Sequence, residues 1–176
     1  MKWLALAVGT VACVVLHTTV GPRLAIGQVR PDLLVVFVVF IAMHVRGVDV
    51  IAAACAVGMV ADLQSIERFG VLALAYAAAA GVVYALRNHV FRSHPLAHFA
   101  MTFGAECVIQ LLLLVYYGLV GGVGGETWGA QVLGGLLMAL YSAALAPPVH
   151  ALLLRMAPWV GVDVPRYAQA GMGRIG

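Results

Sequence analysis

Six apolar blocks, divided by short segments that contain charge, glycine or proline, constrain the fold of this chain more than any motif does. Hydrophobic residues make up 64% of the sequence and charged residues only 10%, whereas a soluble domain usually carries about 25% charged residues. A helix needs about 20 residues to cross a bilayer, so the chain has room for about six spans and little else. The blocks are residues 3–20, 32–45, 48–63, 69–86, 97–119 and 130–157. We therefore expect an all-α integral membrane protein.

The blocks predict one six-helix membrane domain over residues 1–160 and a short cytoplasmic tail over residues 161–176. The second and third blocks are short for a span, and only Arg46 and Gly47 separate them, which favours a tight helical hairpin. At the start of the second block, Pro31 suits the first turn of a helix. Asp32 then lies near the positive end of the helix dipole.

The distribution of basic residues indicates the orientation of the chain. Cytoplasmic loops of membrane proteins carry an excess of Lys and Arg. If the N-terminus is cytoplasmic, seven of the ten basic residues lie inside and three outside. Those inside are Lys2, Arg46, Arg87, Arg92, Arg155, Arg166 and Arg174, and those outside are Arg23, Arg30 and Arg68. We expect both termini and the loop at residues 87–94 to be cytoplasmic, and the glycine-rich segment at residues 121–126 to be external.

Three acidic residues lie within or beside the apolar blocks. Asp49 is expected at the start of a helix near a membrane surface, where a carboxylate is common. Asp62 and Glu106 are less ordinary, because an ionised group near mid-membrane costs roughly 3 kcal/mol or more unless it is paired or protonated. Two interpretations stay open: a proton or cation site, or a polar contact that locks helices together. The second is favoured, because no string of carboxylates forms a relay.

Packing signals are stronger than chemical ones. Small residues recur at four-residue spacing in Ala54 and Gly58, and again in Ala77, Gly81 and Ala85. Such faces let helix backbones approach closely, so we expect them to make helix contacts, either within the bundle or with a partner. In the sixth block, Pro147 and Pro148 remove two amide donors and predict a bend.

Catalytic and metal-binding patterns are weak. We interpret His44, His94 and His98 as headgroup-level residues, and expect His150 to bond to a neighbouring helix. The three cysteines lie in three different blocks and predict small core residues and no disulfide. No combination of serine, histidine and acid has a spacing typical of nucleophilic catalysis. The sequence therefore favours a protein that is not an enzyme and that has no cofactor and no metal.

Several short motifs, taken in order, resemble the MreD family of rod shape-determining membrane proteins. The resemblance begins at Leu16-His17-Thr18-Thr19, continues at Arg30-Pro31-Asp32, and is strongest at Asp62-Leu63-Gln64-Ser65 followed by Gly70. Glu106 and the proline at 147 or 148 also lie where the family tends to place an acid and a proline. The sequence departs from the family at His17, where glutamine is usual, and at Ile66, where glycine is common.

The resemblance implies a non-enzymatic scaffold of the bacterial cell-elongation machinery in the cytoplasmic membrane. Such a protein is expected to bind MreC, to support RodA and penicillin-binding protein 2, to act on MreB indirectly, and to bind no nucleic acid. The family also resembles the six-helix substrate-binding subunits of energy-coupling-factor transporters, so a small-molecule-binding transporter subunit is the alternative. The structural or partner-contact candidates are Arg30, Pro31, Asp32, Ala54, Gly58, Asp62, Ser65, Gly70, Gly81, Ala85, Glu106, Pro147 and Pro148.

Overall fold

The computed structural model describes residues 3–27, 29–45, 47, 49–65, 68–88, 94–120 and 128–160, and within them the chain forms six α-helices. They are α1 (Trp3–Thr19), α2 (Leu33–His44), α3 (Asp49–Asp62), α4 (Val71–Leu86), α5 (Pro95–Val120) and α6 (Trp128–Val160). Each helix matches one predicted apolar block to within a few residues, and the predicted all-α class is confirmed. The predicted tail at residues 161–176 lies outside the described residues.

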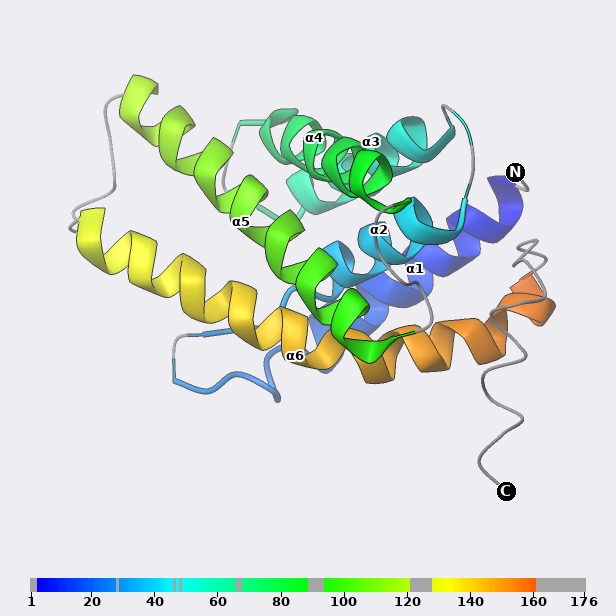
Figure 1. Cartoon of the computed structure of the whole chain (residues 1–176). Coiled ribbons are helices and arrows are strands. Elements are labelled where there is room, and N and C mark those ends of the chain that lie inside the picture. Colours follow the sequence, from blue (N-terminus) through cyan, green and yellow to red (C-terminus); the bar gives the residue numbers. More distant parts are fainter. Residues whose placement is uncertain are drawn as a thin grey trace.

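Helix α2 is the centre of the bundle (Figure 1). All twelve of its residues are buried, and it contacts each of the other five helices. A helix that is apolar on every side has no face to present to water, which agrees with this position. It is about 18 Å long, too short to cross a hydrocarbon core of about 30 Å. We had predicted Pro31 in the first turn of this helix. The helix begins at Leu33, so Pro31 instead precedes it.

The hairpin of α3 and α4 is packed backbone against backbone at Gly58. A Cβ atom at this position would lie 2.5 Å from Ala73 Cα and 2.9 Å from the carbonyl oxygen of Leu72. Neither neighbour is the flexible end of a side chain, so only glycine fits. One of the predicted small-residue faces is thus used inside the molecule.

Helices α5 and α6 are much longer than the others. Only Pro95–Val120 and Trp128–Arg155 are, among the described residues, long and apolar enough to cross a membrane by length and composition. Their far halves, the second half of α5 and the first half of α6, extend past the shorter helices (Figure 1). Large apolar side chains are exposed there, including Leu111, Val115 and Leu119 on α5 and Leu133 on α6.

Helix α6 stays helical through Pro147 and Pro148. Its ribbon nevertheless changes direction between the yellow first half and the orange second half (Figure 1). Proline frees a carbonyl one turn earlier and pushes the helix axis aside, so a bend without a break is the expected geometry.

Candidate functional site

Asp32 is the N-cap of the central helix. One carboxylate oxygen, Oδ1, accepts backbone N–H bonds from Leu34 at 2.9 Å and Val35 at 3.2 Å. These are two of the donors that the first turn of a helix leaves without an intrahelical partner. The negative charge also lies at the positive end of the helix dipole, as predicted.

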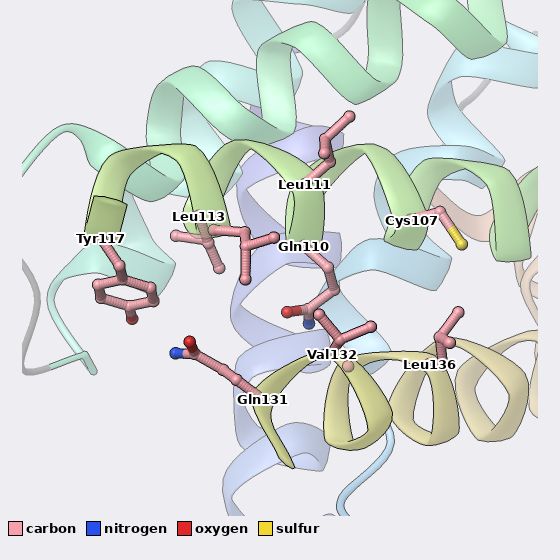
Figure 2. Close-up of a pocket in the computed structure, with 10 residues that line it drawn as sticks. Cys107, Gln110, Leu111, Leu113, Tyr117, Gln131, Val132 and Leu136 are labelled. Atoms are coloured by element: carbon pink, nitrogen blue, oxygen red, sulfur yellow. The ribbon is translucent and has the colours of Figure 1, made fainter. Parts of the chain in front are cut away.

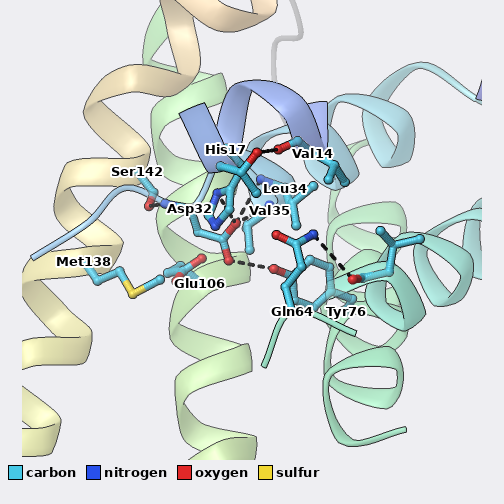
Figure 3. Close-up of polar contacts among 12 residues, drawn as sticks. Val14, His17, Asp32, Leu34, Val35, Gln64, Tyr76, Glu106, Met138 and Ser142 are labelled. Atoms are coloured by element: carbon cyan, nitrogen blue, oxygen red, sulfur yellow. Dashed lines mark hydrogen bonds and ion pairs between the residues drawn. The ribbon is translucent and has the colours of Figure 1, made fainter. Parts of the chain in front are cut away.

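The same aspartate joins α2 to two other helices. The Tyr76 hydroxyl on α4 donates to Asp32 Oδ2 at 2.6 Å, and the Asp32 backbone N–H donates to Ser142 Oγ on α6 at 2.8 Å. From α1, His17 Nδ1 lies 3.9 Å from Oδ1. This distance allows an ion pair if the ring is protonated. Figure 3 shows these side chains converging on one buried centre. Asp32 is therefore a structural junction.

Asp62 caps a helix other than its own. It is the last residue of α3, yet its carboxylate accepts the backbone N–H groups of Gly70 at 2.9 Å, Leu72 at 2.9 Å and Ala73 at 3.1 Å. Gly70, the N-cap residue of α4, has φ of 101° and no side chain to cap with. The Ser65 hydroxyl closes the turn by donating to the Asp62 carbonyl at 3.1 Å. The motif Asp62, Ser65 and Gly70 thus builds the connection between α3 and α4.

Arg87 caps the C-terminal end of α2, as Asp32 caps its N-terminal end. Its guanidinium donates to the Ala42 carbonyl at 3.1 Å and to the Val45 carbonyl, and lies over the Tyr84 ring. A cation at a helix C-terminus is favourable, and this one is buried. Sequence reasoning assigned Arg87 to a cytoplasmic loop and missed its contacts, because both carbonyls lie more than 40 residues away in the sequence.

Glu106 is fully buried in α5, as predicted for an acid that does not face lipid. Its Oε1 accepts a long bond of 3.4 Å from the Gln110 amide, which also approaches Met138 Sδ. Its other oxygen, Oε2, has no hydrogen-bond partner among the residues that the structure describes. Unlike Asp32 and Asp62, this carboxyl caps no helix.

Two histidines that we predicted at headgroup level, His44 and His98, are instead buried and only 8% exposed. His98 Nδ1 lies 2.7 Å from His150 Nδ1, and His150 Nε2 lies 2.9 Å from the Val36 carbonyl, so α5, α6 and α2 meet there. The expected bond between His150 and a neighbouring helix is confirmed. His98 and Glu106 are eight residues apart, about two helical turns, and this spacing was the signal that could have placed His98 on the inner face of α5.

The two small-residue stripes have different environments. Gly58 is packed against α4 and Ala54 is buried, so this stripe makes its contacts within the bundle, one of the two outcomes that its spacing predicted. On α4, Gly81 is half-buried with nothing within 4 Å of where its Cβ would lie, and Ala85 is exposed. Of the remaining candidates, Pro31 is buried, and Arg30 and Pro148 are exposed.

A pocket of about 170 Å³ lies between the far halves of α5 and α6 (Figure 2). Its walls are mostly apolar, with the amides of Gln110 and Gln131 as its main polar groups and Gly135 leaving room beside Gln110. Throughout the described ranges, no group of three or more His, Cys, Asp or Glu side chains could hold a metal ion.

The model of the rod shape-determining protein MreD family matches residues 1–156. The chain belongs to the MreD family. No curated protein and no solved structure was found to match it. Membership places the chain in rod-shape determination and, with two long apolar helices, identifies it as a membrane protein. For this MreD-family chain, the strongest sequence motif, Asp62 to Gly70, now has a physical role as the cap of α4. The predicted likeness to energy-coupling-factor subunits stays a prediction.

Proposed function

We propose that this MreD-family chain is a non-enzymatic scaffold that binds an MreC-like single-span protein by lateral helix contact. Through that partner it supports RodA and penicillin-binding protein 2, with MreB acting from the cytoplasmic side. Family membership supports the place in shape determination. The use of Asp32, Asp62 and Arg87 as internal caps supports a structural role, because these charged groups are already engaged by the protein's own backbone.

The observation that carries the proposal is the unused stripe on α4. Ala77, Gly81 and Ala85 recur every four residues, and a Cβ at Gly81 would meet nothing within 4 Å. Small residues allow close helix approach in lipid, where apolar burial gives little drive for association. The equivalent glycine on α3, Gly58, already packs against the backbone of α4. A partner helix would pack closely against Ala77, Gly81 and Ala85 on α4, in the same way that α4 packs against Gly58 on α3.

The orientation that fits this proposal has both termini in the cytoplasm of a bacterium, with the chain in the cytoplasmic membrane. The excess of basic residues on that side supports it. The capped ends at Asp32 and Asp62 then belong to the outer half of the bundle and Arg87 to the inner half. A partner with an external coiled coil would emerge beside the Asp62–Gly70 connection.

A transport role is the second candidate, and the pocket between α5 and α6 is the observation in its favour. Its volume of about 170 Å³ is below the roughly 300–1,000 Å³ typical of sites for drug-sized ligands. Purification followed by mass spectrometry of bound small molecules separates the two candidates. A stoichiometric ligand that co-purifies without the partner would favour transport.

The scaffold proposal is tested with Gly81→Leu and Ala85→Leu, each assayed by pull-down of the MreC-like partner and by cell shape in a depletion strain. Ala144→Leu is the matched control, because Ala144 is exposed on α6, away from the stripe. We expect the two α4 variants to insert and fold but to lose the partner and rod shape, and the control to retain both. Folded α4 variants that keep the partner yet lose shape would refute the scaffold account.

A further inference from the structure

Helix α5 carries a row of polar residues on its inner face. His98, Thr102, Glu106 and Gln110 follow one another at four-residue spacing, which places them on one side of the helix. Thr102 and Glu106 are fully buried, and His98 is 8% exposed. The row rises about 18 Å along the helix axis. The row is separate from the α4 surface proposed for the partner.

Two side-chain atoms in the middle of this row, on residues one helical turn apart, lack partners among the described residues. Thr102 Oγ1 and Glu106 Oε2 are both buried, and neither makes a hydrogen bond within the part of the chain that the structure describes. Buried polar atoms are almost always bonded to protein or to ordered water. Two such atoms on residues one helical turn apart therefore point to a bound molecule between them. A water molecule satisfies both, since it can donate and accept.

The surroundings of Glu106 suit a neutral carboxyl group. Asp62 receives three backbone N–H bonds, and Asp32 receives two together with a hydroxyl, whereas Glu106 receives one long bond from Gln110. Among the described residues no Lys, Arg or His lies within ion-pair distance of it, and it interacts electrostatically with Asp32. A second negative charge in this apolar interior would be repelled and unpaired.

We propose that Glu106 carries a proton and that Glu106 Oε2 and Thr102 Oγ1 bind a buried water molecule, forming a proton-and-water site inside the bundle. The carboxyl O–H donates to the water, and the water donates to the threonine hydroxyl. No bond is made or broken in this resting arrangement. The ligands are water and an exchangeable proton.

The α5–α6 pocket borders this site through the side chain of Gln110. Gln110 lines the pocket (Figure 2), and its amide donates to Glu106 Oε1, so one side chain separates the pocket from the carboxyl. Gly135 makes room for that amide: a Cβ there would lie 3.2 Å from the Gln110 side chain. In the proposed site, the Glu106 proton exchanges by way of this pocket.

The other end of the row is the pair of His98 and His150. Because the Val36 carbonyl can only accept, His150 Nε2 must carry a proton. In the neutral ring His150 Nδ1 then accepts, and His98 Nδ1 donates to it. The pair holds a single proton between its two facing nitrogens. The row thus has a protonated carboxyl group at its middle, and at one end a histidine pair in which His98 donates the hydrogen bond and His150 accepts it.

Infrared spectroscopy of the full chain in nanodiscs tests the proposal at neutral pH. We expect the carbonyl band of a protonated carboxyl group, lost in Glu106→Gln and retained in the control Asp62→Asn. Thr102→Val should shift the band toward that of a carboxyl without a hydrogen bond, and Thr102→Ser should leave it in place. Gly135→Val should slow the shift of the band after transfer to heavy water.

Absence of the band in the wild-type chain, or its survival in Glu106→Gln, would overturn the protonated site. An unchanged band in Thr102→Val would overturn the water bridge. If Glu106→Gln does not fold, the double variant Glu67→Gln and Glu126→Gln, labelled with ¹³C at its one remaining glutamate carboxyl group, gives the same answer. The band then moves with the label if it belongs to glutamate, and it stays if an aspartate is protonated instead.

Discussion

At the scale of single residues, Asp62 is a cap supplied from the neighbouring helix. Asp62→Ala removes the acceptor of three backbone N–H groups at the start of α4. We expect a loss of about 2 kcal/mol or more in the free energy of unfolding, because loss of an N-cap costs about 0.5–2 kcal/mol and buried unpaired donors add to it. Asp62→Asn keeps one acceptor oxygen and should lose less.

Thermal unfolding in detergent measures this difference. Gln64→Ala is the control, because the Gln64 side chain is exposed and makes only a 3.5 Å bond within its own helix. A midpoint for Asp62→Ala equal to that of Gln64→Ala would show that the cap contributes nothing.

Glu106 should tolerate an amide better than a methyl group. In Glu106→Gln the side chain keeps an acceptor for Gln110 and gains amide donors for the water molecule that we propose beside Thr102. Glu106→Ala leaves both without a partner and opens a cavity, so the yield of folded protein should fall further. Size-exclusion profiles of the two variants give the comparison. Equal losses would mean that the acid itself, and no hydrogen bond, is required.

The residues that sequence reasoning placed correctly are those whose role is local. Asp32 lies at the start of an apolar run and caps that same run. Glu106 is an acid inside an apolar block, and burial follows from its setting. The burial of His98 and the contacts of Arg87 were not predicted, because their partners are distant in sequence: His150 follows His98 by 52 residues, and Ala42 precedes Arg87 by 45. No local pattern encodes such a pairing.

At the scale of helices, Gly58 and Gly81 differ in their surroundings. Gly58 packs against the α4 backbone, whereas nothing lies within 4 Å of where a Cβ at Gly81 would be. Gly58→Ala places a Cβ against the backbone of Ala73 and should cost about 1–3 kcal/mol through overpacking. Gly81→Ala meets nothing and should be neutral or stabilise α4 by up to about 1 kcal/mol, since alanine favours helix more than glycine does. Unfolding midpoints in detergent report both. Similar losses for the two variants would mean that the α3–α4 contact is not the tight one.

Helix positions could be predicted more completely than helix environments. All six blocks became helices, because long apolar runs in this composition have no other way to satisfy their backbone groups. The central place of α2 was not predicted. Its short length and its lack of a polar face were visible in the sequence, but which helices enclose it depends on contacts between distant segments.

At the scale of the whole molecule, orientation can be checked directly. In a background without the native cysteines, Gly124→Cys should react with a membrane-impermeant maleimide added from outside, and Ser93→Cys should react only after permeabilisation. The reason is the excess of basic residues on the side of Ser93. Labelling of Ser93→Cys in intact cells would reverse the topology.

The enclosed position of α2 also has a consequence for biosynthesis. Two of the contacts that hold it, from Asp32 to Ser142 and from Val36 to His150, connect it to α6, which is translated after the other five helices. The first five helices are therefore synthesised while α2 still lacks its contacts with α6. A chain truncated before α6 leaves α2 with an open side, so we expect membrane proteases to remove it quickly, and pulse-chase labelling of such a truncation would measure how long the unfinished bundle survives.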